Sequence, residues 1–308
     1  MAKISKRRIK ESIAGHLFIM PVLLGILIFT FLPIVYALIC STFRFDMFPE
    51  FTFARLKEFG EFYGFGNYLD IFRMSSRREV FLQSLKVTSV YSVIEIPLML
   101  VCSFALAVLL NQKMKGMRLY RTLFYLPVLL PAVCSGIVWF RLTEKHGVFN
   151  HLFEILGLPQ YGWFNYKKTS MPSFIFMSMY GVGGNMILWL AQLKNVPQSV
   201  YESARLDGAS KARQLFQITI PLCTPMILYN TIISIIGTLQ TYGQVVTLTG
   251  GGGVDYSLYF FVHNIYAYYE TPEFGYACAL SFVLFLIIGV LTLITMRTSK
   301  WVYYGEEG

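Results

Sequence analysis

Six long apolar stretches, nearly free of charged residues, constrain this chain more than any other feature. A helix needs about 20 mostly apolar residues to cross the hydrocarbon core of a membrane. We expect spans over residues 16–40, 87–110, 122–140, 171–193, about 218–246 and about 274–296. Only 14% of the residues are charged while 55% are hydrophobic, whereas a soluble domain has about 25% charged residues. The sequence therefore predicts an all-α, multi-pass membrane protein with six transmembrane helices and disfavours a soluble enzyme.

The distribution of Lys and Arg predicts the orientation. Basic residues gather before the first span, at 113–121, at 194–213 and after the last span, whereas residues 247–273 contain no Lys or Arg. Cytoplasmic loops of membrane proteins carry the excess of basic residues. We therefore expect both termini in the cytoplasm. This arrangement explains the net charge of +9 better than binding to nucleic acid does.

Several kinds of cofactor chemistry find no support in the sequence. The five cysteines lie in or beside apolar runs and are interpreted as packing residues. No Cys/His cluster has zinc-site spacing, and His146 and His151 form a poor metal pair. No Gly-Lys pair occurs, so the chain has no P-loop to hold ATP phosphates. We expect no metal and no cofactor in this chain.

The segment between the fourth and fifth spans, at about 195–221, predicts two short helices joined at a bend. Ser199 and Glu202 have the spacing of a capping box, which predicts a helix that begins at Val200. Gly208 lies where such a helix would end in a left-handed residue. Ser210 can then cap a second helix that continues to Pro221. From the residues alone, a capped turn between two spans explains the segment equally well.

The same segment resembles the EAA loop of permease subunits in binding-protein-dependent ABC importers. The family pattern is E-A-A, three residues, G, nine residues, I-x-L-P, and this chain departs from it at Ser203 and Ile220 while keeping the spacing. The surrounding sequence is similar to the carbohydrate-uptake branch, of the type of the first maltose or glycerol-3-phosphate permease subunit, although Gly253 replaces its usual proline. The residues that carry this likeness are Pro197, Tyr201, Asp207, Gly208, Ala209, 249–252, 275–277 and 301–304.

The resemblance implies a MetI-like, type I importer permease in the cytoplasmic membrane of a prokaryote. Residues 1–78 would hold the cytoplasmic tail, the first helix and the first outer loop, and residues 79–308 a five-helix permease core. The partners would be a second, related permease subunit, two cytoplasmic ATPase subunits that bind ATP and Mg, and an extracytoplasmic solute-binding protein. The loops 41–79 and 141–170 could receive that binding protein or merely join spans.

The resemblance also assigns a role to the bent segment, as the coupling helix that docks on an ATPase. Glu202 would face a basic residue of the partner, although helix capping is a rival role, and Gly208 would permit the bend. The implied ATPase-coupling residues are Glu202, Ser203, Ala204, Asp207, Gly208, Ile218 and Pro221.

A polar stripe on the fifth span marks a candidate route for the solute. Ser234, Thr238 and Thr241 lie at i, i+4 and i+7, on one helical face. Hydrogen bonding between helices is the plain alternative, whereas the resemblance places the sugar site at this segment and at two glycines of the fourth span. The residues of the proposed substrate pathway are Ser234, Thr238, Thr241, Tyr242, Asn230, Gly181, Gly184 and Asn185, with Trp189 beside them.

Four alternatives stay open at this point. Glu95 is the one acid deep inside an expected span, and it could bind a proton or cation or pair with another helix. An ion-coupled secondary transporter would need more buried charges and internal repeats. A membrane-embedded enzyme would need a cluster of acids, His or Lys near one membrane face. The sequence leaves the sugar unspecified, and glycerol-3-phosphate or a related polyol phosphate is an alternative substrate, although the polar stripe contains no Arg or Lys.

Overall fold

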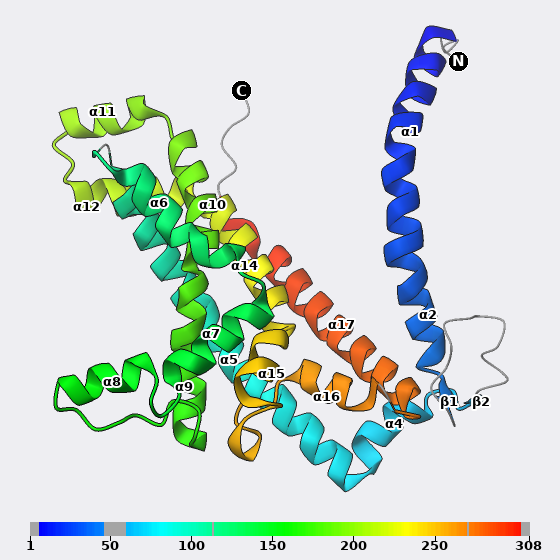
Figure 1. Cartoon of the computed structure of the whole chain (residues 1–308). Helices are drawn as coiled ribbons and strands as arrows, with labels where there is room; N and C mark the ends of the chain where they lie inside the picture. Colours follow the sequence, from blue (N-terminus) through cyan, green and yellow to red (C-terminus); the bar gives the residue numbers. More distant parts are fainter. Residues whose placement is uncertain (1–5, 46–59, 113, 270, 303–308) are drawn as a thin grey trace. The chain divides into compact units, whose positions relative to one another are not determined.

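The computed structural model describes residues 6–45, 60–112, 114–269 and 271–302, with side chains from residue 15 onward. Most of the described chain is helical (Figure 1). It divides into two compact units, one of residues 1–74 and 265–282 and the other of residues 75–264 and 283–308. The predicted boundary near residue 78 stays a prediction.

The first unit contains the N-terminal helix and a small hairpin. Helix α1 (Lys6–Ile26), the π-helical turn η1 (Leu27–Phe31) and α2 (Leu32–Cys40) follow one another, and residues 15–40 are long and apolar enough to cross a membrane. Strands β1 (Phe43–Phe45) and β2 (Gly60–Phe62) pair antiparallel, and α4 spans Gly66–Arg73. This hairpin of three-residue strands rich in Phe is a small addition to the expected helical fold.

Three further helical segments in the chain pass the length and composition criteria for a span. Helix α5 (Ser75–Leu110) begins well before the predicted residue 87. Helix α9 (Lys167–Ser178), the turn η4 (Met179–Gly181) and α10 (Val182–Asn195) form a second segment, and α17 (Phe274–Arg297) is the third. Together with residues 15–40, these give four continuous candidate spans among the described residues.

The third predicted span is bent sharply and is not one helix over 122–140. Helix α6 (Met117–Tyr125) and the 3-10 turn η3 (Leu126–Leu129) meet α7 (Ala132–Thr143) and α8 (Val148–Ile155) at 101°. Leu130 is extended and Pro131 precedes α7, as expected because a proline disfavours helical geometry in the residue before it. The break therefore follows directly from Pro131.

The fifth predicted span, 218–246, is also divided. Helix α12 (Lys211–Gln214), the π-helical turn η5 (Leu215–Thr219) and α13 (Ile220–Leu222) meet α14 (Thr224–Leu239) at 64°. A separate helix, α15 (Gly243–Thr249), follows α14. The predicted outer end at residue 246 is thus wrong. The count of six spans holds when each bent pair counts as one span.

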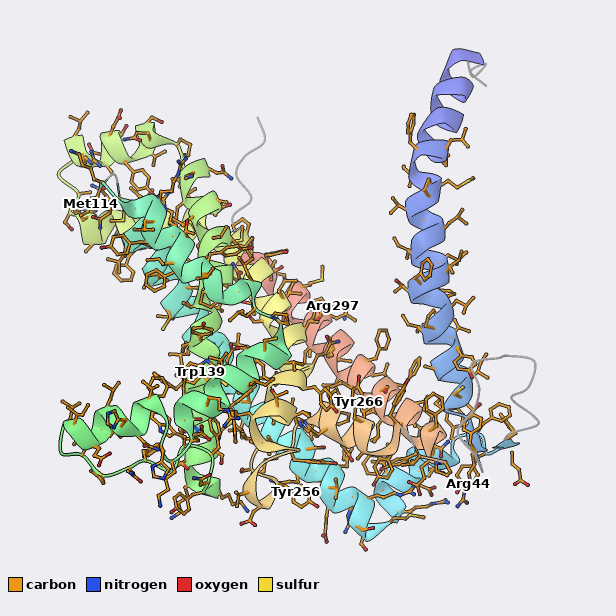
Figure 2. All side chains as sticks on the ribbon, viewed as in Figure 1. Arg44, Met114, Trp139, Tyr256, Tyr266 and Arg297 are labelled. Atoms are coloured by element: carbon orange, nitrogen blue, oxygen red, sulfur yellow. The ribbon has the colours of Figure 1, made fainter. Side chains whose placement is uncertain are left out.

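The remaining short helices are α11 (Gln198–Leu206), η6 (Val254–Tyr256), α16 (Phe261–Tyr269) and η7 (Ser299–Trp301). Two apolar clusters hold the second unit together. One surrounds Tyr91, Trp139 and Phe174, and the other surrounds Met186 and Trp189. Trp139 lies in the middle of this unit in Figure 2. These clusters fix α5, α7, α10 and α15 against one another, and this packing positions the site.

Candidate functional site

The predicted elbow exists, and it lies at one end of the segment formed by α9 and α10. Helices α11 and α12 follow the end of α10, whereas α8 lies near the opposite end of that segment (Figure 1). Helix α11 begins at Gln198, directly after Pro197, and no side chain caps it. The predicted capping box of Ser199 and Glu202 is therefore wrong, because the extended Pro197 already sets the start of the helix. Capping alone no longer explains Glu202.

The bend itself forms as predicted. Gly208 has a left-handed backbone, with φ of 76°. The amide of Ala209 donates to the carbonyl of Ala204 at 2.9 Å, and the amide of Gly208 donates to that of Arg205 at 3.0 Å. These two bonds make a Schellman motif, for which glycine is the usual residue. The prediction for Gly208 is confirmed.

The second arm is capped and tied to the first. The amide of Arg213 donates to Oγ of Ser210 at 3.2 Å, which confirms Ser210 as the cap of α12. The hydroxyls of Tyr201 on α11 and Thr219 on η5 lie 2.9 Å apart. Gln214 donates through Nε2 to the carbonyl of Ala209 at 2.8 Å. These hydrogen bonds join the two arms and hold the elbow together as one unit.

The outer surface of the elbow carries most of the predicted coupling residues. Glu202, Ser203, Asp207, Gly208 and Pro221 are exposed, and Ala204 and Ile218 are half-buried. Sequence reasoning missed Leu206, whose side chain is 90% exposed at the end of α11. Leu206 therefore adds an exposed apolar group to the acidic residues of this surface.

A cavity of about 380 Å³ lies between α5, the η3–α7 bend, the η4–α10 segment and α14. It brings together several of the predicted pathway residues. Those that line it are Gly181, Asn185, Ser234, Thr238 and Thr241. A larger cavity of about 750 Å³ lies beside α7 and α15, and none of the predicted pathway residues lines it.

Three other predicted pathway residues are placed outside the lining of this cavity. Gly184 faces Val128, which a Cβ would meet at 3.6 Å. Asn230 is buried and donates through Nδ2 to the carbonyl of Met226 at 3.0 Å. The ring of Tyr242 packs on His263 with centroids 4.8 Å apart.

Trp189 is likewise a core residue. Its Nε1 donates to Oγ of Ser103 at 3.0 Å, and its ring packs edge-on against Phe104. The indole fills the interior between α5 and α10, and Trp189 does not line the cavity.

The threonines of the stripe are held by their own helix. Thr238 donates to the carbonyl of Ser234 at 2.8 Å, and Thr241 donates to that of Gly237 at 3.4 Å. Each hydroxyl oxygen keeps lone pairs that can accept a further hydrogen bond. The two threonines can therefore offer acceptors to a solute without leaving their own donors unpaired.

Sequence reasoning did not place several residues that line the cavity. Tyr91, Glu95 and Met99 follow one another at spacings of four on one face of α5. Ser135, Ser178 and Tyr180 contribute further polar groups. Glu95 carried the only signal in the sequence, as a lone acid inside an apolar helix, whereas scattered serines and tyrosines are too common to single out.

Comparison with known proteins identifies the family of this chain. The family of binding-protein-dependent transport system inner membrane components matches residues 98–302. The chain is 34% identical to the probable ABC transporter permease protein YesP of Bacillus subtilis, over 97% of this chain and 94% of that protein. This chain belongs to that permease family. The predicted family and the predicted inner-membrane location are therefore confirmed.

Two further relatives extend the comparison. This permease is 29% identical to the trehalose/maltose transport system permease protein MalF of Thermococcus litoralis, over 96% of this chain and 97% of that protein. The crystal structure of a bacterial alginate ABC transporter, in complex with an alginate pentasaccharide-bound periplasmic protein, matches the fold with a TM-score of 0.77 and 19% identity. That match covers 96% of both chains. It confirms the MetI-like importer fold.

Proposed function

We propose that this permease moves a carbohydrate inward through the cavity between α5, α10 and α14, driven by ATP hydrolysis in a partner. The observation that carries the proposal is the composition of the cavity lining. Hydroxyls and amides of Ser234, Thr238, Asn185 and Gln244 face one space together with the ring of Tyr180. Sugars are bound by such hydroxyl and amide groups combined with aromatic rings. The names of sugar-transporting relatives support the same substrate class.

The elbow is the proposed site of coupling to a cytoplasmic ATPase, which would bind the ATP and Mg. Leu206 offers an apolar contact, and Glu202 offers a charge for a basic residue of that partner. The brace between Tyr201 and Thr219 would let the elbow move as one piece. Closure of two ATPases would then shift the cavity between inward-facing and outward-facing states by rigid-body motion. No covalent chemistry is required of this chain.

The complete importer would contain three further kinds of subunit. A second, related permease would form the other half of the transport path, two ATPases would bind the elbows, and an extracytoplasmic binding protein would deliver the solute. The importer with a bound periplasmic protein supports this assembly by its fold. With the elbow inside, both termini of this chain would be cytoplasmic. We place the loop that contains α8 (Val148–Ile155) on the outer side, toward the binding protein.

The test is ATP-driven uptake in vesicles that contain the assembled importer. Uptake of labelled solute with ATP and binding protein, and without an ion gradient, is the expected result. Uptake that needs the gradient and ignores ATP would overturn the proposal. Glu202→Gln should lower both uptake and solute-stimulated ATP hydrolysis severalfold, because it removes the charge while keeping the shape. Lys300→Gln, which removes an exposed charge on η7 outside the elbow, is the matched control and should leave both unchanged.

A further inference from the structure

Glu95 is a carboxylate buried at the wall of the proposed transport cavity. Only 6% of its surface is exposed, and it lies between Tyr91 and Met99 on the face of α5 that lines the cavity. Its Oε2 has no hydrogen-bond partner among the described residues. A buried polar atom without a partner costs free energy, and this oxygen is placed to accept a hydrogen bond from a solute in the cavity.

The surroundings of Glu95 supply no opposite charge. Among the described residues that line the cavity, none is Lys, Arg or His. The remaining polar groups are hydroxyls and amides, among them Ser178, Ser234 and Thr238. A carboxylate in such a space makes its potential negative, and the low dielectric of the membrane interior strengthens that effect.

We propose that Glu95 makes this cavity exclude anions, so that the permease accepts uncharged glycans and rejects glycans that carry carboxylate or phosphate groups. The inference rests on the proposed transport path and adds a selectivity to it. A sugar hydroxyl can donate to the unpaired Oε2, which satisfies both groups at once. A uronate or a sugar phosphate would instead bring a second negative charge into a space that offers no cation to balance it.

The experiment measures the sign of the potential inside the cavity and does not require the solute to be known. Thr238→Cys places a thiol in the cavity of the assembled importer in vesicles. The rates of its modification by a cationic and by an anionic methanethiosulfonate reagent are compared at about pH 8, where carboxyl groups are normally ionised. The parent importer without the new thiol gives the background from the five native cysteines.

With Glu95 present, the cationic reagent should react faster than the anionic one. Glu95→Gln should reduce the cation-to-anion rate ratio by on the order of tenfold, because one charge at close range changes both rates in opposite directions. Glu79→Gln is the matched control, since Glu79 is an exposed acid on the same helix and does not line this cavity. It should leave the ratio unchanged.

Two results would overturn the inference, and only one of them would also overturn the proposed transport path. If Glu95→Gln leaves the cation-to-anion rate ratio unchanged, Glu95 does not exclude anions, while the proposed transport path is unaffected. If neither reagent modifies the thiol at position 238, the proposed transport path is contradicted, and the exclusion of anions by Glu95 is contradicted with it. An acidic glycan or a polyol phosphate whose uptake is lost on deletion of this permease would also contradict the exclusion of anions, whereas an uncharged glycan would support it.

Discussion

Three neighbouring glycines show how one residue type serves different purposes in this chain. Gly181 borders the cavity, and a Cβ placed there would meet no atom within 4 Å. A Cβ on Gly183 would overlap the carbonyl oxygen of Phe124, so α10 can approach α6 only because this residue is glycine. The backbone of the facing helix, which no pattern in the sequence records, decides which of these glycines makes a close contact.

Gly183→Ala should destabilise the permease by about 1–3 kcal/mol, because α6 and α10 must move apart to admit the methyl group. Thermal unfolding of the purified protein in detergent should show a lower Tm. Gly181→Ala is the control and should leave the Tm unchanged, since its methyl group enters open space. Equal effects of the two substitutions would contradict this account of the α6–α10 contact.

His263, on α16 outside the candidate spans, should make stability depend on pH. Burial lowers the pKa of His263 to about 4 from 6.5, and neither ring nitrogen has a partner among the described residues. The unfolded chain then binds more protons between these values. Stability present above about pH 6.5 is lost as the pH falls, by up to about 1.4 kcal/mol per pH unit.

Thermal unfolding of the purified permease from about pH 7 to about pH 4 checks this prediction. This range spans the pKa values of His263 in the unfolded and folded chain. His263→Phe removes the titrating group and keeps a ring against Tyr242 and Tyr259. The variant should show a flatter Tm profile through this range. A wild-type profile as flat as that of the variant would show that His263 is not the group responsible.

At the scale of elements, the sequence predicted a serine cap for two helices, but only one of the two serines is a cap. Ser210 has an extended backbone and accepts from the amide of Arg213, whereas Ser199 lies inside α11 because Pro197 starts that helix two residues earlier than predicted. The capping-box spacing describes side chains, but the cap depends on the backbone of the first residue. The break at Pro131 divides the span expected over residues 122–140, because the proline disfavours helical geometry at Leu130.

Gly208→Ala should strain the elbow by about 1 kcal/mol, because a residue with a Cβ disfavours left-handed geometry. Its Cβ would meet no atom within 4 Å, so the cost is conformational only. Hydrogen exchange over residues 198–222 should become faster and ATP-driven uptake should fall. Gly208→Asn should restore much of both, since Asn adopts this conformation more readily. Equal loss in both variants would point to steric conflict at a docking surface instead of backbone strain.

At the scale of the whole molecule, the sequence predicted the family, the upper count of spans and the elbow. The apolar runs and the fixed spacing from Glu202 to Pro221 are local patterns that one sequence displays directly. The cavity required the relative positions of α5, the η3–α7 bend, α10 and α14, which no local pattern records. Tyr242 and Asn230 therefore lie outside the lining of the cavity, and Ser178 and Tyr180 were not anticipated from the sequence.

The predicted orientation is open to a labelling test with two single-cysteine variants. Ser199→Cys on α11 and Glu154→Cys on α8 place thiols at exposed positions beyond the two ends of the segment formed by α9 and α10. A membrane-impermeant maleimide should label position 154 in intact cells and position 199 only in inside-out vesicles. This pattern follows from the basic residues around the elbow. The reverse pattern would place the elbow, and with it both termini, outside the cell.

The 64° corner at Cys223 has a mechanical consequence. The elbow's second arm and the cavity-lining helix α14 are consecutive in the chain, yet they do not share an axis. Pro221 and Pro225 stand on either side of the corner, and the side chain of Cys223 is fully buried, so the joint is stiff. Under the proposed coupling, motion of the second arm along its own axis would therefore reach α14 at an angle, and not along the axis of α14. Part of that motion would be a sideways rotation of α14, which would turn its hydroxyl-bearing face toward or away from the solute.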